Sequence, residues 1–265
     1  MKAAVYGIDG KQKGEVSLPR QFSSAVRTDI IRRAVLAERS ENRQPYGSDK
    51  LAGKRTSAHY HGLRRYRYTM MCKEMARLPR IHGRVGYLSF TARFAPQTVK
   101  GRRAHPPKVE KVWKEKINKK EWMKAFCSAI AASADRSMVA SRNHALEGLK
   151  FPIVVEDRLQ EIKKTSEAEK ALVSLGLEKE LDRTSERKVR AGRGKSRGRR
   201  LKERKGPLIV VAEDRGITKA ASNIAGVEAT TVADLSVEML APGTHPGRLC
   251  VWTESAIGVL AKTAK

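Results

Sequence analysis

Leu208-Ile-Val-Val-Ala212 is the clearest buried strand in this chain of 265 residues, and two similar runs follow it, Val227-Glu-Ala-Thr-Thr-Val232 and Leu249-Cys-Val-Trp-Thr253. Each run is short, mostly apolar and contains β-branched residues, which is typical of a strand inside a sheet. The chain between and after these strands is expected to be helical, over residues 218–224, 234–240 and from 255 onward. Strands that alternate with helices at this spacing build βαβ units. The sequence therefore predicts an α/β fold, with a mainly parallel sheet flanked by helices.

The amino-terminal half continues this pattern on both sides of a long interruption. We expect two strands joined by a turn, three helices, a buried strand and a fourth helix. These elements are expected at residues 3–8, 14–18, 24–40, from 118, at 137–146, 151–155 and 166–176. Asn118 with Glu121, and Ser166 with Glu169, have the residue types of capping boxes. Residues 1–42 and 109–265 are therefore expected to form one globular body.

Two segments carry most of the net charge of +27. Residues 43–108 contain 16 Lys or Arg against Asp49 and Glu74, and residues 183–205 contain 12 against Glu186 and Glu203. No alternating or 3.6-period apolar pattern spans residues 43–108, so we expect no core there. We interpret residues 43–108 as a long extended basic loop inserted in the body, and residues 183–205 as a second basic segment within it.

Charge of this density indicates a polyanionic partner. Nucleic acid is favoured, because neutralising phosphates with Lys and Arg releases condensed counterions. An anionic membrane is the alternative, but it is disfavoured because basic membrane-binding segments need an apolar face opposite the charge. We therefore predict RNA binding and no membrane partner.

The cysteine content and the distribution of apolar residues favour a cytoplasmic protein. The three cysteines, at 72, 127 and 250, include no C-x-x-C pair, which argues against a zinc knuckle and a disulfide framework. Met1–Gly10 has no apolar signal-peptide core, and the weakly polar run Ala125–Ala134 is too short to span a bilayer.

The run Arg190–Arg200 superficially resembles a phosphate-binding loop of nucleotide-binding proteins. That loop requires a glycine separated by four residues from its Gly-Lys-Ser, and Val189 stands at that position. Arg and Lys interleaved with Gly suit instead a backbone that lies close to phosphates without obstruction from side chains. We predict RNA contact there and no nucleotide cofactor.

Two patterns in the first basic segment have competing interpretations. Pro106 and Pro107 stiffen Gly101–Lys108, which either presents its cations to RNA or serves as a basic linker. His59-Tyr-His61 is half of a metal site, but no second pair or carboxylate lies nearby in the sequence. Base stacking or simple exposure is therefore favoured for these histidines, and we predict neither a metal nor another cofactor.

Glu213 and Asp214 follow a predicted strand, where α/β enzymes often place catalytic carboxylates. A solvated turn or a helix cap is the more ordinary role for such a pair. The alternative function that this pair leaves open is an RNA-modifying enzyme with basic RNA-binding arms.

Several longer motifs together resemble one family. They are Ala52–Ala58, Pro79–Arg84, Ala95–Lys111, Arg190–Arg200 and Leu240–Ala256. The chain resembles ribosomal protein four of the large subunit in its archaeal and eukaryotic form, and the similarity runs nearly end to end. This resemblance implies a body bound to large-subunit ribosomal RNA (rRNA) and a loop that lines part of the nascent-peptide exit tunnel. It also implies neighbouring ribosomal proteins and the nascent peptide as partners.

We therefore predict a structural, non-enzymatic protein of the large ribosomal subunit that supports rRNA assembly. The residues expected to contact RNA from the first segment are Lys54, Arg55, Arg64, Arg65, Arg67, Arg80, Arg84, Arg102, Arg103, His105 and Lys108. Those expected from the second are Arg190, Arg193, Lys195, Arg197, Arg199 and Arg200.

Overall fold

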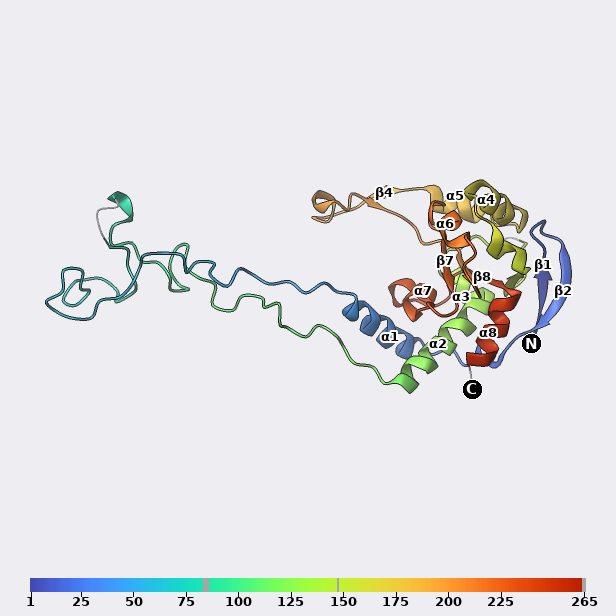
Figure 1. The fold of residues 1–265 in the computed structure, drawn as a ribbon, viewed down its shortest axis with the longest axis horizontal. Helices are drawn as coiled ribbons and strands as arrows, with labels where there is room; N and C mark the ends of the chain where they lie inside the picture. The colour runs from blue at the N-terminus through green and yellow to red at the C-terminus, as the bar shows by residue number, and fades with distance from the viewer. Residues whose placement is uncertain (83–85, 147, 264–265) are drawn as a thin grey trace. The chain divides into compact units, whose positions relative to one another are not determined.

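The computed structural model describes residues 1–82, 86–146 and 148–263 (Figure 1). Contacts divide the chain into two compact units, which we call the body, Met1–Asn42 with Lys114–Lys265, and the loop unit, Arg43–Trp113. The body contains the main sheet and every α-helix that the structure describes.

A six-stranded sheet forms the centre of the body, in the order β2-β1-β3-β8-β6-β7. Its strands are β1 Lys2–Tyr6, β2 Gln12–Ser17, β3 Ile153–Val155, β6 Leu208–Val211, β7 Glu228–Thr231 and β8 Cys250–Thr253. Only β2 is antiparallel to its neighbour; the other pairs are parallel, with Val5 opposite Val154 and Ile209 opposite Val251. This arrangement confirms the predicted α/β fold.

Alternate side chains of the central strands pack into two separate hydrophobic cores, one on each face of the sheet. Leu208 and Val210 point into one core, whereas Ile209 and Val211 point into the other, and all four are fully buried. A strand that is covered on both faces must be apolar at every position. This requirement is why the run 208–212 could be recognised as a strand from the sequence.

Helices cover both faces of the sheet (Figure 1). Helices α1, α2, α7 and α8 pack with the first core, and α3, α4 and α6 pack with the second. The helices are α1 Thr28–Glu41, α2 Lys119–Ala134, α3 Arg136–Ser141, α4 Thr165–Ser174, α5 Glu178–Ser185, α6 Ile217–Ser222, α7 Val237–Leu240 and α8 Glu254–Thr263. In the described part of the chain, no helix is long and apolar enough to cross a membrane.

The helix starts differ from the predicted ones. Helix α1 begins after Arg27 rather than at a serine cap. Asn118 precedes α2 without a side-chain cap bond, and Lys164 rather than Ser166 precedes α4, so both predicted capping boxes are wrong. Helix α5 was missed altogether, because two of the side chains that it buries, Glu180 and Thr184, are polar and produce no apolar period.

The loop unit is held together by backbone contacts between its two arms. Ser48 N–H donates to the carbonyl of Pro107 over 3.2 Å, and isolated β-bridges join His59 to Arg80 and Arg80 to Ala92. Between these points, Gly53 has φ +73°, and a Cβ there would lie 2.6 Å from the Arg102 Cα. A side chain at this glycine would therefore push the arms apart.

The prediction that this segment has no core is wrong in one respect. Met70 and Ile81 are buried, with exposed fractions of 1% and 9%. Met70 N–H donates to the His61 carbonyl over 3.2 Å, and Ile81 N–H donates to Thr91 over 3.1 Å. These contacts join residues that are nine and ten positions apart in the chain, and a periodic pattern of apolar residues cannot predict them.

Candidate nucleic-acid interface

The second basic segment forms a short hairpin, which we call the hairpin arm, residues 188–202. Strand β4, Lys188–Val189, pairs antiparallel with β5, Leu201–Lys202, and Arg190 N–H donates to the Arg200 carbonyl over 2.7 Å. A single 3₁₀ turn, Lys195–Arg197, lies at the tip and ends at Gly198, which has φ +79°. Glycine adopts this left-handed conformation without steric cost, which explains one of the interleaved glycines.

Ion pairs and carbonyls bind the cations at the base of the hairpin arm. Arg183 donates to Glu180 over 2.7 Å and to the Lys205 carbonyl over 2.8 Å. Arg204 donates to the Arg183 carbonyl over 3.1 Å and pairs with Glu186 over 2.8 Å. These arginines anchor the hairpin arm to the body, so they are not free for an external phosphate.

Five predicted RNA contacts of the hairpin arm are exposed, and none has an ion pair in the part of the chain that the structure describes. They are Arg193, Lys195, Arg197, Arg199 and Arg200. Arg190 differs, because its Nε donates to the Arg199 carbonyl over 3.0 Å and its guanidinium also reaches the Leu201 carbonyl. The side chain of Arg190 therefore braces the hairpin.

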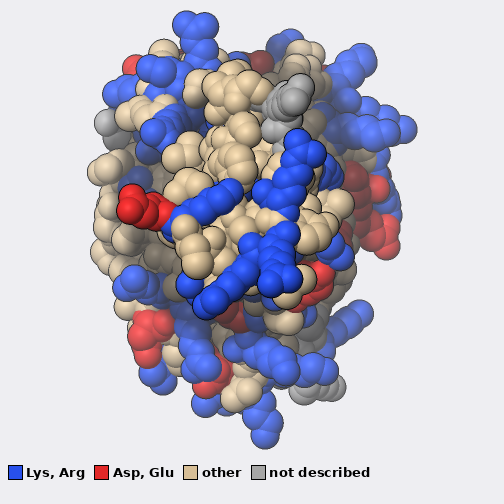
Figure 2. Space-filling model, turned by 90° about the vertical axis from the view of Figure 1, so that its left-hand side faces the viewer, with Lys and Arg blue, Asp and Glu red and all other residues tan. Residues whose placement is uncertain are grey.

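Seven predicted contacts of the loop unit are likewise exposed and form no ion pair among the described residues. They are Lys54, Arg64, Arg65, Arg67, Arg103, His105 and Lys108. Arg55 is exposed but pairs with Asp49, Arg102 is half-buried, and Arg84 lies outside the described residues. In Figure 2, Lys and Arg side chains outnumber acidic ones over the visible face.

Arg80 has an internal role that the sequence did not indicate. Its guanidinium donates to the carbonyls of Phe90 and Ala76, each over 2.9 Å, and its backbone forms both β-bridges of the loop unit. The guanidinium thereby links Arg80 to Phe90, which lies ten residues further along the chain. Arg80 organises the surface that carries the other cations, and both terminal nitrogens of its guanidinium already donate to backbone carbonyls.

Aromatic side chains beside the predicted cations form a hollow that sequence analysis missed. It is lined by Tyr46, Arg103, His105, Pro106, Pro107, Lys108, Glu110, Lys111 and Trp113. Tyr46 stacks on Trp113 with ring centroids 5.3 Å apart, and the Arg43 guanidinium lies 3.9 Å from the Trp113 ring. Cations next to stacked rings suit an unpaired base. The sequence feature that could have indicated this hollow is that Tyr46 and Trp113 flank the basic residues of the first segment.

Asp214 and Glu213 show no catalytic arrangement. The Asp214 carboxylate accepts the N–H groups of Gly216 over 2.9 Å and Thr218 over 3.3 Å, at the start of α6. The hydrogen bond from Gly216 lowers the pKa of Asp214. Glu213 is exposed and pairs with Arg215 over 3.4 Å. Asp214 is therefore a helix-capping residue.

Comparison with known proteins agrees with this geometry. Residues 16–263 match the model of the "Ribosomal protein L4/L1 family". The chain is 46% identical to the large ribosomal subunit protein uL4 of Archaeoglobus fulgidus, over 99% of each chain. It is 45% identical to the uL4 protein of Nanoarchaeum equitans, over 98% of this chain and 97% of that one. The uL4 protein of Methanosphaera stadtmanae is 42% identical, over 97% and 95% respectively.

Proposed function

The chain belongs to the ribosomal protein L4/L1 family, and on this basis we propose that it is a structural protein of the large ribosomal subunit in the cytoplasm. It binds large-subunit rRNA, supports the assembly of that rRNA and lines part of the nascent-peptide exit tunnel with the loop unit. The relatives carry the names of ribosomal proteins and not of enzymes, which supports a non-catalytic role.

One observation carries the RNA-binding part of this proposal. Exposed cations without ion pairs are concentrated on the hairpin arm and the loop unit, whereas the arginines at the base of the arm bind acidic groups and carbonyls. Unpaired Lys and Arg keep their full charge for phosphates, and phosphate contacts orient a protein on RNA without reading its sequence.

The hollow beside Trp113 supplies a different kind of contact. A base that stacks there would meet an aromatic face and the charges of Arg103 and Lys108. Such stacking contributes about 1–3 kcal/mol per base and requires an unpaired nucleotide. We therefore propose that the hairpin arm binds duplex or folded rRNA by its phosphates, and that the hollow holds a single-stranded or bulged nucleotide.

Sedimentation of native cell extract tests the main proposal. The protein is expected to migrate with large ribosomal subunits, and ultraviolet crosslinking of those subunits is expected to join rRNA to peptides of the hairpin arm and of residues 101–113. If the protein sediments only as a free pool, it is not a subunit component. Crosslinks confined to the body outside both segments would move the RNA interface elsewhere.

Salt dependence tests whether phosphates dominate. A dozen phosphate contacts predict that the logarithm of rRNA affinity falls linearly with the logarithm of salt concentration, with a slope of about −8 to −11. Filter binding of the RNA-free protein to large-subunit rRNA across a salt series measures this slope. A slope shallower than about −3 would mean that stacking or apolar contacts dominate.

Replacing residues 62–81 by a short Gly-Ser linker tests the tunnel assignment. The segment lies within the loop unit and contributes nothing to the two cores of the body. Because the replaced residues pack on neither core, and because a change in loop length alters closure entropy by less than about 1 kcal/mol, the melting temperature of the body should shift by no more than a few degrees.

In mapped ribosomal subunits, the same replacement is expected to remove density from the tunnel wall and to abolish crosslinks to the nascent peptide. Deleting the tip of the hairpin arm, residues 192–198, is the matched control and should leave the tunnel wall intact. Unchanged density and crosslinks in the 62–81 variant would assign the tunnel contact to another segment or protein.

A further inference from the structure

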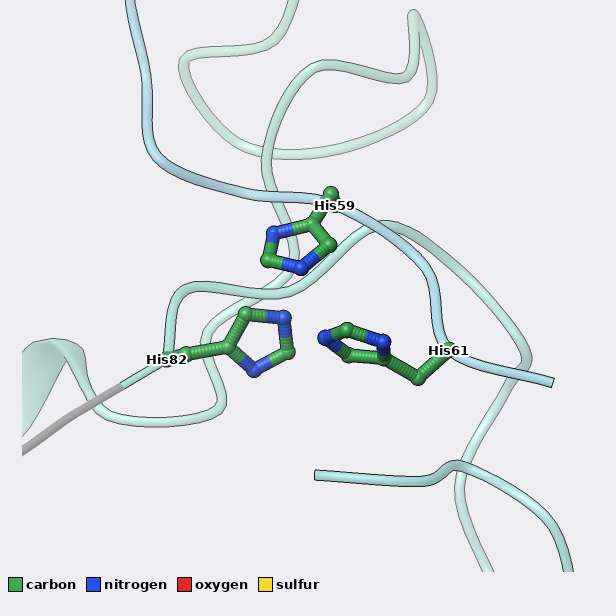
Figure 3. A group of neighbouring side chains, drawn as sticks. All are labelled: His59, His61 and His82. Carbon is green, nitrogen blue, oxygen red and sulfur yellow. The ribbon is translucent and has the colours of Figure 1, made fainter. Parts of the chain in front are cut away.

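Three histidine side chains meet in the loop unit: His59, His61 and His82 (Figure 3). One ring nitrogen of each lies within 4.8 Å of one ring nitrogen of each of the others. The ring centroids are 4.1 Å apart for His59 and His61, 4.2 Å for His59 and His82, and 4.6 Å for His61 and His82. In Figure 3 the three rings converge on one point between two chain segments.

Backbone hydrogen bonds hold both of these segments in place. His59 and Arg80 exchange N–H to carbonyl bonds of 3.3 and 3.2 Å. His61 lies two residues after His59, and their rings lie on the same side of the chain with centroids 4.1 Å apart. The neighbour of His82, Ile81, bonds to Thr91 and Phe90 over 3.1 and 3.0 Å. The three rings are therefore brought together by a fixed backbone.

The ring nitrogens have few partners in the protein. Both ring nitrogens of His82 are buried, and neither meets the geometry of a hydrogen bond with any residue that the structure describes. His59 Nδ1 lies 3.2 Å from the Ser57 carbonyl, so Nδ1 carries the proton and Nε2 retains its lone pair. Buried polar atoms normally have partners, and leaving one unpaired costs about 1–3 kcal/mol. A ligand that accepts lone pairs would satisfy this cluster.

Two of the three rings, His61 and His82, are shifted toward their neutral form. Burial, followed by the charges of the neighbouring histidines, lowers the pKa of His61. Burial and then the charge of His59 lower the pKa of His82. Neutral imidazole is the form that coordinates metals, because the protonated ring has no free lone pair.

We propose that His59, His61 and His82 coordinate one Zn²⁺ ion, with water in the fourth position. Three imidazole nitrogens, in a group to which no described carboxylate belongs, suit Zn²⁺ and not Mg²⁺ or Ca²⁺, which prefer oxygen ligands. Zn–N bonds of about 2.0–2.1 Å place tetrahedral nitrogens about 3.3 Å apart, so small side-chain rotations close the site. The hydrogen bond from His59 Nδ1 to Ser57 would orient that ring.

The sequence led to the opposite prediction for a definite reason. His59-Tyr-His61 alone is half of a site, and His82 is 21 positions further along the chain. The fold of the loop unit supplies the third ligand. A metal bound by all three rings would join the same two segments that the backbone pairing of His59 with Arg80 already links.

Aromatic packing is the competing explanation for the cluster. His61 stacks on Tyr66 with centroids 4.4 Å apart, and Tyr68 lies 4.8 Å from His82 and 6.4 Å from Phe90. Packing of this kind needs no ion, and the surrounding arginines oppose a dication. The experiment must therefore detect the metal itself and identify its ligands.

Zinc titration of the full-length, chelator-treated, RNA-free protein is the first test. One equivalent of Zn²⁺ is expected to bind, and His59→Ala, His61→Ala and His82→Ala are each expected to weaken that binding more than about 100-fold. Losing even a supporting partner of a ligand costs about 10–100-fold. The controls are His105→Ala and Cys72→Ser, which remove an exposed histidine and an exposed cysteine of the same unit. Both variants should bind Zn²⁺ with the affinity of the parent protein.

X-ray absorption of the Zn²⁺-loaded parent protein is the second test, and it requires no variant to fold. Three imidazole nitrogens and one oxygen at about 2.0–2.1 Å are expected, without sulfur. The proposal is overturned if no equivalent binds, if a sulfur neighbour at about 2.3 Å appears, or if the three alanine variants bind as the parent does. In the last case the cluster is aromatic packing alone.

Discussion

Replacing Arg197, Arg199 and Arg200 together by alanine is expected to weaken binding to large-subunit rRNA more than about 100-fold at 0.1 M salt. Arg197 lies in the turn at the tip of the hairpin arm, and Arg199 and Arg200 lie between that turn and β5; all three are exposed and without ion pairs in the described chain. Each lost phosphate contact removes about 0.7 to 0.9 from the salt slope, so the slope should become shallower by about 2 to 3. Filter binding across a salt series measures both quantities.

The loss is also expected to be nearly the same for different RNAs, because phosphate contacts carry little sequence information. Lys119, Lys120 and Lys124 on α2 are exposed and provide a matched triple-alanine control on the body. The lysine control should change the salt slope of rRNA binding far less than the triple-arginine variant does. A strong loss confined to one RNA hairpin would mean that these arginines read bases, which contradicts their assignment as phosphate contacts.

Glu180→Ala is expected to lower the free energy of unfolding by about 3–5 kcal/mol. The Glu180 carboxylate is fully buried and accepts hydrogen bonds from His144 Nδ1 over 2.6 Å, from Arg183 over 2.7 Å and from Ala145 N–H over 3.0 Å. Truncation leaves His144 Nδ1 and the Ala145 N–H without this acceptor, and it leaves Arg183 without its counter-charge. Chemical denaturation of the RNA-free protein measures the change.

Glu178→Ala is the control, because Glu178 is exposed on the same helix. It should change stability by no more than about 0.5 kcal/mol. If both variants unfold at the same denaturant concentration as the parent, the buried network contributes nothing to the stability of the body.

The same network predicts how stability depends on pH. Burial alone would raise the pKa of Glu180, but hydrogen bonds from Arg183, His144 and Ala145 outweigh burial and lower it to about 2. A carboxyl whose pKa is lower in the folded state stabilises the fold above its unfolded pKa of 4.5, and this contribution is lost as pH falls toward 2. The contribution is on the order of 3 kcal/mol.

Comparing the parent with Glu180→Gln, which cannot ionise, isolates this contribution. The difference in unfolding free energy between the two proteins is expected to be constant above about pH 5 and to shrink as pH falls below 4. A difference that stays constant down to pH 2.5 would show that Glu180 is not ionised in the folded protein.

Local sequence was sufficient for the strands of the sheet. All six predicted strands are present with ends within two residues of the observed ones. Strands β3, β6 and β8 are buried on both faces and therefore appear as short apolar runs, whereas the mostly exposed β2 was indicated by the Asp9-Gly10 turn before it. The strand order was not predictable in the same way. Strand β1 pairs with β3, and Val5 lies opposite Val154. Such pairing depends on contacts between residues far apart in the chain, which no local pattern encodes.

Buried charges could not be recognised from the sequence. Arg248 is fully buried, where it donates to Glu228 over 2.6 Å and to the Gly206 carbonyl over 2.9 Å. Glu180 is buried on a helix that was missed. A charged residue is normally exposed, and it enters a core only where the fold supplies partners for it.

The sequence by itself determined the α/β body, the two basic segments and most of their exposed cations, because apolar runs and clusters of like charge are local properties of a chain. Only the tertiary structure decided which of these cations form no hydrogen bond or ion pair within the described chain. Arg80 and Arg190 bind carbonyls of other segments, whereas Arg64 and Arg197 have no such partner among the described residues. It also decided that His82 joins His59 and His61. Both outcomes depend on which atoms meet across the fold, and residue type alone cannot specify that.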